Sequence, residues 1–388
     1  MTKIRQILWS TTVVLVSMFF ILTGFSWYGI KQPVSAQPNS STSFYLPLVV
    51  CSDCTRNIPV PTPDPLQPSQ TAIYSVTVTN DLQFGVADII SGTMLAAQAD
   101  GAIQATTNVS IPLYLDLYEP VGASAGKRPV VMWMFGSGFV DINANRQGRF
   151  VPIAQELAAR GYVVVSIDYR TAFRNPVVSA QAQPYLDQII TPVDNSWVPF
   201  VFPTLTEEQY ERAIAAAYDD GLTGLNWIAS QAEIRQLDLN RVAFMGSSSG
   251  TTTGNSLAYL SDEIGISTPK IAVMLHLWGG MDYSRTDGLD EIEADEAKLF
   301  MIHSIGDAAA IGGVDYANAK EMGERAAAIG LPYELLTLQP NPNGITPALQ
   351  AGTGHGLSQV PILEALSDDG QNTLFQRLVN FLNNALTE

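Results

Sequence analysis

Positively charged side chains are scarce in this chain. Its 388 residues include 20 Lys and Arg against 37 Asp and Glu, which gives a formal net charge of −17. A surface of that sign repels phosphate backbones and anionic lipid headgroups. The composition therefore argues against a nucleic-acid partner and favours a neutral or cationic small molecule.

Cysteine is almost absent, with only Cys51 and Cys54. Two thiols without a neighbouring histidine make a poor zinc site, and a thioredoxin-like motif would have to follow a βα unit. A local disulfide in an oxidising compartment is the interpretation that remains.

Charged residues of both signs are also few, at 15% of the chain, whereas hydrophobic residues make up 46%. An average soluble domain has about 25% charged residues. This composition is typical of an ordered globular protein and excludes a disordered one. No internal repeat or low-complexity tract stands out.

The first 36 residues have the pattern of an export signal. Lys3 and Arg5 precede an uncharged apolar run over residues 7–30, and small residues follow near Ala36. This order predicts a cleaved secretory signal. The run also exceeds the ~20 residues that span a bilayer, so an uncleaved anchor is the alternative. Both predict an exported protein: secreted, periplasmic, or anchored by its N-terminus and facing outside.

A proline-rich linker over residues 37–70 leads into the main domain, residues 71–388. The five prolines of residues 59–68 favour an extended spacer over helix or sheet. After it, residues 73–79 and 111–118 alternate apolar and polar side chains, which predicts antiparallel edge strands.

From Arg128 onward, short apolar, β-branched runs alternate with stretches of helical periodicity. The expected strands are residues 129–135, 162–169, 242–246, 271–278, 299–304 and 333–338. The expected helices are residues 148–159, 207–230, 249–260, 316–329 and 373–386. This alternation predicts an α/β fold, a mostly parallel sheet with helices on both faces. Residues 171–206 interrupt it with several prolines, and we expect them to form an inserted cap or lid.

The clearest chemical signal is Gly246-x-Ser248-x-Gly250, which lies between a predicted strand and a predicted helix. In a nucleophile elbow the tight turn needs glycines on both sides and lifts the serine above the sheet. The pentapeptide alone is weak, since serine-rich turns are common. Its setting makes Ser248 our candidate nucleophile.

A serine nucleophile needs a general base, and the chain has only three histidines. His276 lies within an apolar run, so we expect a hydrogen-bonded core residue. His303 ends a strand and is expected to stabilise the next loop. His355 lies in a glycine-flanked loop after the last strand, where an imidazole can reach the sheet's C-terminal edge, so it is the predicted base.

The third member of a serine hydrolase's catalytic triad, after the serine and the histidine, is a carboxylate that orients the imidazole. Asp307 follows the strand before it by a short turn and falls between serine and histidine in the chain. The order Ser, Asp, His favours Asp307. Asp282, which follows the preceding strand, is the alternative, and either could simply cap a turn.

Residues from about 113 to 386, roughly 70% of the chain, resemble the esterase and lipase (carboxylesterase) branch of the α/β-hydrolase superfamily. The resemblance is carried by residues 128–139, 158–170, the elbow, residues 302–307 and residues 354–356. It implies an α/β-hydrolase fold. The family's His-Gly-Gly-Gly turn, which offers N–H groups to the oxyanion, here reads Phe135-Gly136-Ser137-Gly138. We expect these N–H groups to remain donors, with that of Ser249 as a further one, although the supporting histidine is missing.

Together these features predict a serine hydrolase that cleaves carboxylic esters through an acyl-enzyme. It would act on a small-molecule or lipid-like ester and require no metal or cofactor. An amide or peptide hydrolase with the same triad is one alternative, and a non-catalytic binding protein of the same fold is another. Contact with a membrane is expected only through an uncleaved N-terminal segment, and the sequence gives no oligomeric state.

Overall fold

The computed structural model describes residues 68–91, 108–122, 126–141, 144–148, 150–191, 196, 198–281, 288–305, 307, 315–338 and 362–387. All of them belong to the second of two compact units, Met1–Asp64 and Pro65–Glu388. The predicted export segment, residues 1–36, lies outside the described residues, as do His355 and Asp282. No helix in the described ranges has the length and apolar composition needed to cross a bilayer.

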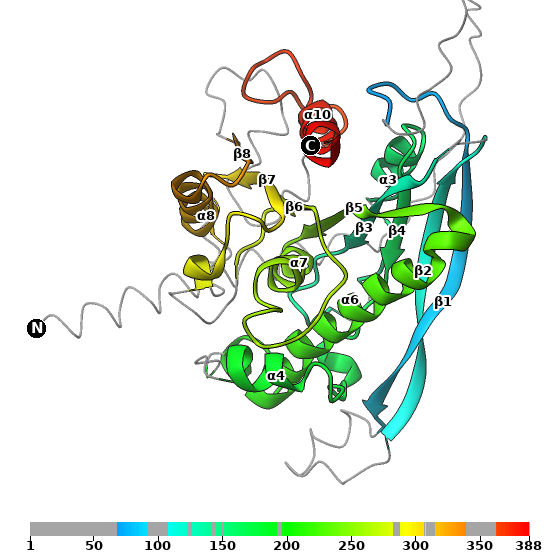
Figure 1. Cartoon of the computed structure of the whole chain (residues 1–388). Helices are drawn as coiled ribbons and strands as arrows, with labels where there is room; N and C mark the ends of the chain where they lie inside the picture. The colour runs from blue at the N-terminus through cyan, green and yellow to red at the C-terminus, as the bar shows by residue number, and fades with distance from the viewer. Residues whose placement is uncertain are drawn as a thin grey trace, which may run out of the picture. The chain divides into compact units, whose positions relative to one another are not determined.

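An eight-stranded sheet forms the centre of the second unit, in the order β1-β2-β4-β3-β5-β6-β7-β8 (Figure 1). Strands β3 to β8 pair in parallel, whereas β1 pairs antiparallel with β2 and β2 with β4. The strands are β1 Val76–Ile90, β2 Asn108–Pro120, β3 Arg128–Met134, β4 Val163–Ile167, β5 Leu237–Ser247, β6 Val273–Leu277, β7 Lys298–Ser304 and β8 Tyr333–Leu338. The predicted mostly parallel sheet is confirmed.

Helices cover both faces of the sheet. The longer ones are α3 Phe150–Ala158, α6 Glu207–Arg235, α7 Ser249–Tyr259, α8 Tyr316–Ile329 and α10 Leu374–Thr387. Helices α6 and α7 lie side by side on one face (Figure 1). On the other face, the guanidinium of Arg160, just after α3, lies 4.9 Å from the ring centre of Phe375 in α10. This two-sided cover keeps β3, β4, β6, β7 and residues 242–247 of β5 almost fully buried.

The segment predicted as a cap, residues 171–206, contains only short helical pieces where it is described. They are η1 Ala172–Arg174, α4 Gln183–Tyr185, η2 Leu186–Ile190 and α5 Val198–Val201. Tyr185, Ile189 and Val198 are buried against the rest of the domain. Its role as a cap stays a prediction.

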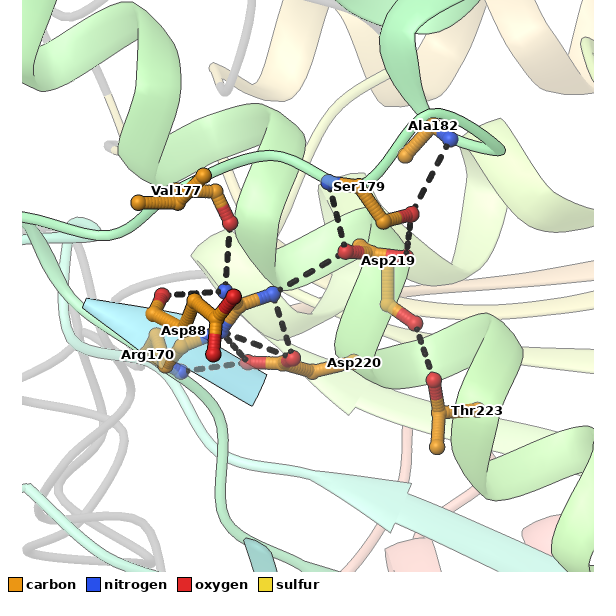
Figure 2. Close-up of polar contacts among 8 residues, drawn as sticks. All are labelled: Asp88, Arg170, Val177, Ser179, Ala182, Asp219, Asp220 and Thr223. Atoms are coloured by element: carbon orange, nitrogen blue, oxygen red, sulfur yellow. Dashed lines mark hydrogen bonds and ion pairs between the residues drawn. The ribbon is translucent and has the colours of Figure 1, made fainter. Parts of the chain in front are cut away.

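Arg170, directly before this segment, anchors it through a buried ion-pair network (Figure 2). Its guanidinium donates to both carboxylate oxygens of Asp220 at 3.0 Å and to Asp219 at 3.1 Å, both in α6. The same group donates to the carbonyls of Asp88 in β1 and Val177. Arg170 and Asp220 are each 1% exposed. One side chain thus ties β1, α6 and the beginning of the segment together.

Asp220→Asn is expected to lower the free energy of unfolding by about 3 kcal/mol, because removing one partner leaves a buried charge poorly compensated. Urea unfolding measures this loss. The matched control is Glu233→Gln, which breaks an exposed pair with Lys127 and should cost under about 1 kcal/mol. Equal losses in the two variants would contradict a special role for the buried network.

Candidate active site

Ser248 lies at the junction between β5 and α7. Strand β5 ends at Ser247 and α7 begins at Ser249, which confirms the predicted strand-turn-helix order. Ser248 itself has φ 50° and ψ −120°, a backbone conformation that costs of order 1–3 kcal/mol in a residue other than glycine. Its flanking residues are buried while Ser248 is partly exposed. This combination is the geometry of a nucleophile elbow.

The glycines on either side of Ser248 are required by close backbone approaches. A Cβ at Gly246 would lie 2.4 Å from the carbonyl oxygen of Gly250. A Cβ at Gly250 would lie 2.3 Å from the carbonyl oxygen of Met134, at the end of β3. Any side chain at either position would clash with the backbone. Steric exclusion therefore explains why glycine occupies both positions two residues from Ser248.

The turn after β3 lies directly against the candidate nucleophile. A Cβ at Gly136 would lie 2.8 Å from Cβ of Ser248 and 2.7 Å from the carbonyl oxygen of Ser247. The chain then turns sharply, with φ 60° at Gly138 and φ 64° at the buried Phe139. The structure therefore brings the predicted oxyanion turn and Ser248 together.

The four predicted oxyanion donors are not equivalent. The N–H of Ser137 donates to Oγ of Ser249 at 2.8 Å. Within the described part of the chain, the N–H groups of Gly136, Gly138 and Ser249 have no acceptor. Gly136 and Gly138 are partly exposed, whereas Ser249 is fully buried. The oxyanion role of all four residues stays a prediction.

Asp307 lies at the same sheet edge, just after β7. Its N–H donates to the carbonyl of Ser304 at 3.0 Å, and its carbonyl accepts the N–H of Tyr316 at 3.1 Å. The backbone of Asp307 is therefore held by hydrogen bonds on both sides of the residue. The residue is 3% exposed. Strand β7 is two places from β5 in the sheet, which separates their ends by about 10 Å. An imidazole from another loop can bridge that gap to Ser248.

His276 is a buried core residue, as predicted, and His303 is buried as well. His276 and His303 are both 0% exposed, and each has Nε2 near the carbonyl oxygen of Gly279, at 3.0 and 3.2 Å. Burial, followed by the proximity of His303, lowers the pKa of His276 to about 3, so this imidazole is neutral. His303 Nδ1 lies 3.6 Å from Oδ2 of Asp307. Both imidazoles therefore contact Gly279, just after β6, and His303 also contacts the carboxylate of Asp307.

Tyr169, two residues after β4, is a site residue to which the sequence pattern assigned no role. Its hydroxyl lies 2.7 Å from Oγ of Ser137 and 3.0 Å from Oγ of Ser249. It also lines a pocket of about 620 Å³ between the β1–β2 hairpin and residues 168–175, beside Leu113 and Phe173. The sequence does carry one signal for Tyr169: it is a tyrosine directly after an apolar strand, and so is expected at the C-terminal edge of the sheet.

Within the described residues, no cluster of three or more His, Cys, Asp or Glu side chains is arranged to hold a metal ion.

Comparisons with known families match two parts of the chain. Residues 210–318, which include the elbow and Asp307, match a family model described as alpha/beta hydrolase fold. Residues 115–185, which include the turn after β3 and Tyr169, match a model described as BD-FAE.

Similar proteins include a curated plant enzyme and a bacterial esterase. The probable tuliposide A-converting enzyme b6 of Tulipa gesneriana is 24% identical over 223 residues, which cover 52% of this chain and 49% of that protein. The chain thus spans about half the length of this curated relative. The propionate-bound esterase of Thermogutta terrifontis is 16% identical, with a TM-score of 0.47, covering 71% of this chain and 89% of that one. Its apo form gives the same identity and TM-score, with 71% and 90% covered.

Proposed function

Since the chain has the α/β-hydrolase fold, we propose that it is a serine hydrolase that cleaves carboxylic esters through an acyl-enzyme intermediate. The observation that carries the proposal is the conformation of Ser248. A non-glycine residue with φ 50° persists between two sterically required glycines, and its Cβ lies beside Gly136 of the turn after β3. Such a strained backbone conformation persists only where surrounding contacts hold it in place, and it occurs most often at active sites.

In the proposed mechanism Ser248 attacks the ester carbonyl, while His355 takes its proton and later delivers it to the leaving alcohol. Asp307 holds the imidazole in the correct orientation and stabilises its charged form. The developing oxyanion is bound by N–H groups of the Gly136–Gly138 turn and of Ser249. Water then hydrolyses the acyl-enzyme by the same route. The role of His355 rests on its place in the sequence.

The net charge of −17 and the aromatic residues of the inserted segment, residues 171–206, support an uncharged substrate with an apolar portion. The tulip enzyme's name refers to tuliposide A, and the solved relative is an esterase with propionate bound, so a small-molecule or lipid-like ester fits this proposal. We also propose that the protein acts outside the cytoplasm, because the pattern of residues 1–36 supports export.

Hydrolysis of a series of p-nitrophenyl esters of rising acyl length tests the proposal. We expect turnover of at least the short esters, unaffected by a metal chelator, because the proposed mechanism uses backbone donors where a metal enzyme would use a cation. A loss of activity in chelator that added metal restores would contradict the mechanism.

The alternatives give different results in parallel assays. An amide or peptide hydrolase would turn over the matching p-nitroanilides as well as the esters, whereas an ester hydrolase would turn over the esters alone. A non-catalytic binding protein of this fold would turn over neither, and that result would reject the proposed function.

A further inference from the structure

Three hydroxyl groups meet beneath the turn that follows β3. They belong to Tyr169, Ser137 and Ser249, and Ser249 comes directly after the candidate nucleophile. The Tyr169 hydroxyl lies 2.7 Å from Oγ of Ser137, 3.0 Å from Oγ of Ser249 and 3.0 Å from the carbonyl oxygen of Phe135. The serine oxygens in turn accept the N–H of Phe139 at 3.1 Å and the N–H of Ser137 at 2.8 Å.

These contacts allow one consistent placement of the hydroxyl protons. The carbonyl of Phe135 can only accept, so Tyr169 donates its single proton there. Tyr169 Oη then accepts the protons of both serine hydroxyls. Each serine oxygen, having donated, accepts one backbone N–H. All three hydroxyls are satisfied, and the network contacts Phe135, Ser137 and Phe139 of the turn.

The ring of Tyr169 supports the same turn. It stacks on Phe135, with ring centres 4.4 Å apart and planes at 23°. It meets Phe139 edge-on, with centres 6.4 Å apart. Phe139 has φ 64°, an unfavourable conformation for a bulky residue that must be held by its surroundings. Tyr169 therefore contacts both ends of a strained turn, through its ring and through its hydroxyl.

We infer that Tyr169 is a positioning residue for the oxyanion turn, acting through Ser137 and Ser249 and supplying the support that Phe135 cannot give. This inference rests on the proposed function. The network fixes the direction of the turn's N–H groups before substrate binds. It also joins the turn to α7, so that the donors on the two sides of Ser248 keep one geometry. Small displacements of these N–H groups are expected to lower kcat, because the oxyanion that they stabilise exists only near the transition state.

Tyr169→Phe tests the inference, since it removes the hydroxyl and leaves the stacked ring. We expect kcat to fall on the order of 10- to 100-fold while KM changes less than about 3-fold. Inhibition by an alkyl trifluoromethyl ketone, which forms a tetrahedral oxyanion with the serine, should weaken in step with kcat/KM. The control is Tyr218→Phe, which removes a buried hydroxyl bonded to Ser261 at 2.7 Å and should leave kcat unchanged.

Ser249→Ala and the double variant show whether the hydroxyls act as one unit. Ser249→Ala should lower kcat by a similar factor, and combining it with Tyr169→Phe should add little, because residues of one network are not additive. If Tyr169→Phe fails to fold, Ser249→Ala and Ser137→Ala carry the test, as each removes one hydroxyl and no ring.

Wild-type kcat and inhibitor affinity in folded Tyr169→Phe would overturn the inference, as would effects that multiply in the double variant. Either result would leave the proposed function standing if the parent protein still hydrolyses esters. A parent protein that neither hydrolyses esters nor binds the ketone would instead reject the proposed function, and the inference with it.

Discussion

Ser248→Ala is expected to abolish ester hydrolysis, with kcat reduced by up to about 10⁶-fold, the loss seen when a serine nucleophile is removed from a comparable triad. The variant lacks Oγ, the atom that forms the acyl bond in the proposed mechanism. Its fold should be retained, because Ser248 is partly exposed and its conformation is set by Gly246 and Gly250. Steady-state turnover of a short p-nitrophenyl ester measures the effect.

The matched control for Ser248→Ala is Ser230→Ala, which changes an exposed serine in α6. It should keep the parent's turnover and melting temperature. Residual activity in Ser248→Ala above about 1% of the parent's, in protein that melts normally, would place the nucleophile elsewhere.

Asp307→Asn is expected to lower kcat by about 10⁴-fold, because an amide no longer orients the imidazole or stabilises its charge. The substitution is nearly isosteric, and the backbone hydrogen bonds of Asp307 to Ser304 and Tyr316 do not involve its side chain. The folded structure should therefore survive. Turnover and near-ultraviolet circular dichroism, measured on the same preparation, separate loss of catalysis from loss of fold.

Asp315→Asn is the control for the acid, since Asp315 follows the same strand and caps α8 by accepting the N–H of Asn318 at 2.9 Å. It should leave kcat unchanged. Near-parent activity in Asp307→Asn, together with an inactive Asp282→Asn, would transfer the role of triad acid to Asp282.

The central strands could be predicted because two-sided burial leaves an unambiguous sequence pattern. The buried parts of strands β3 to β7 are short, mostly apolar runs, and the predicted ranges overlap each of these strands. At the edge the pattern is weaker. The prediction for β1 stopped at residue 79, whereas the strand continues to Ile90. Register shifts between Thr79 and Leu82, and between Gln83 and Gly85, interrupt the alternation there.

The candidate site could be predicted in part, because the strand-turn-helix geometry around Ser248 is encoded by neighbours in the sequence. Gly246, Ser248 and Gly250 signal it within five residues. Tyr169 could not be identified in this way, since its partners Ser137 and Ser249 are 32 and 80 residues away and meet it only across the sheet. The same holds for Arg170 and its pair Asp220, 50 residues apart.

Labelling with a fluorophosphonate probe tests the central claim most directly, because only an activated serine attacks the phosphorus. The purified protein should gain the mass of one probe, and peptide mapping should place it on Ser248. Ser248→Ala should remain unlabelled. Labelling that persists in Ser248→Ala, or a modified peptide that does not contain Ser248, would contradict the account.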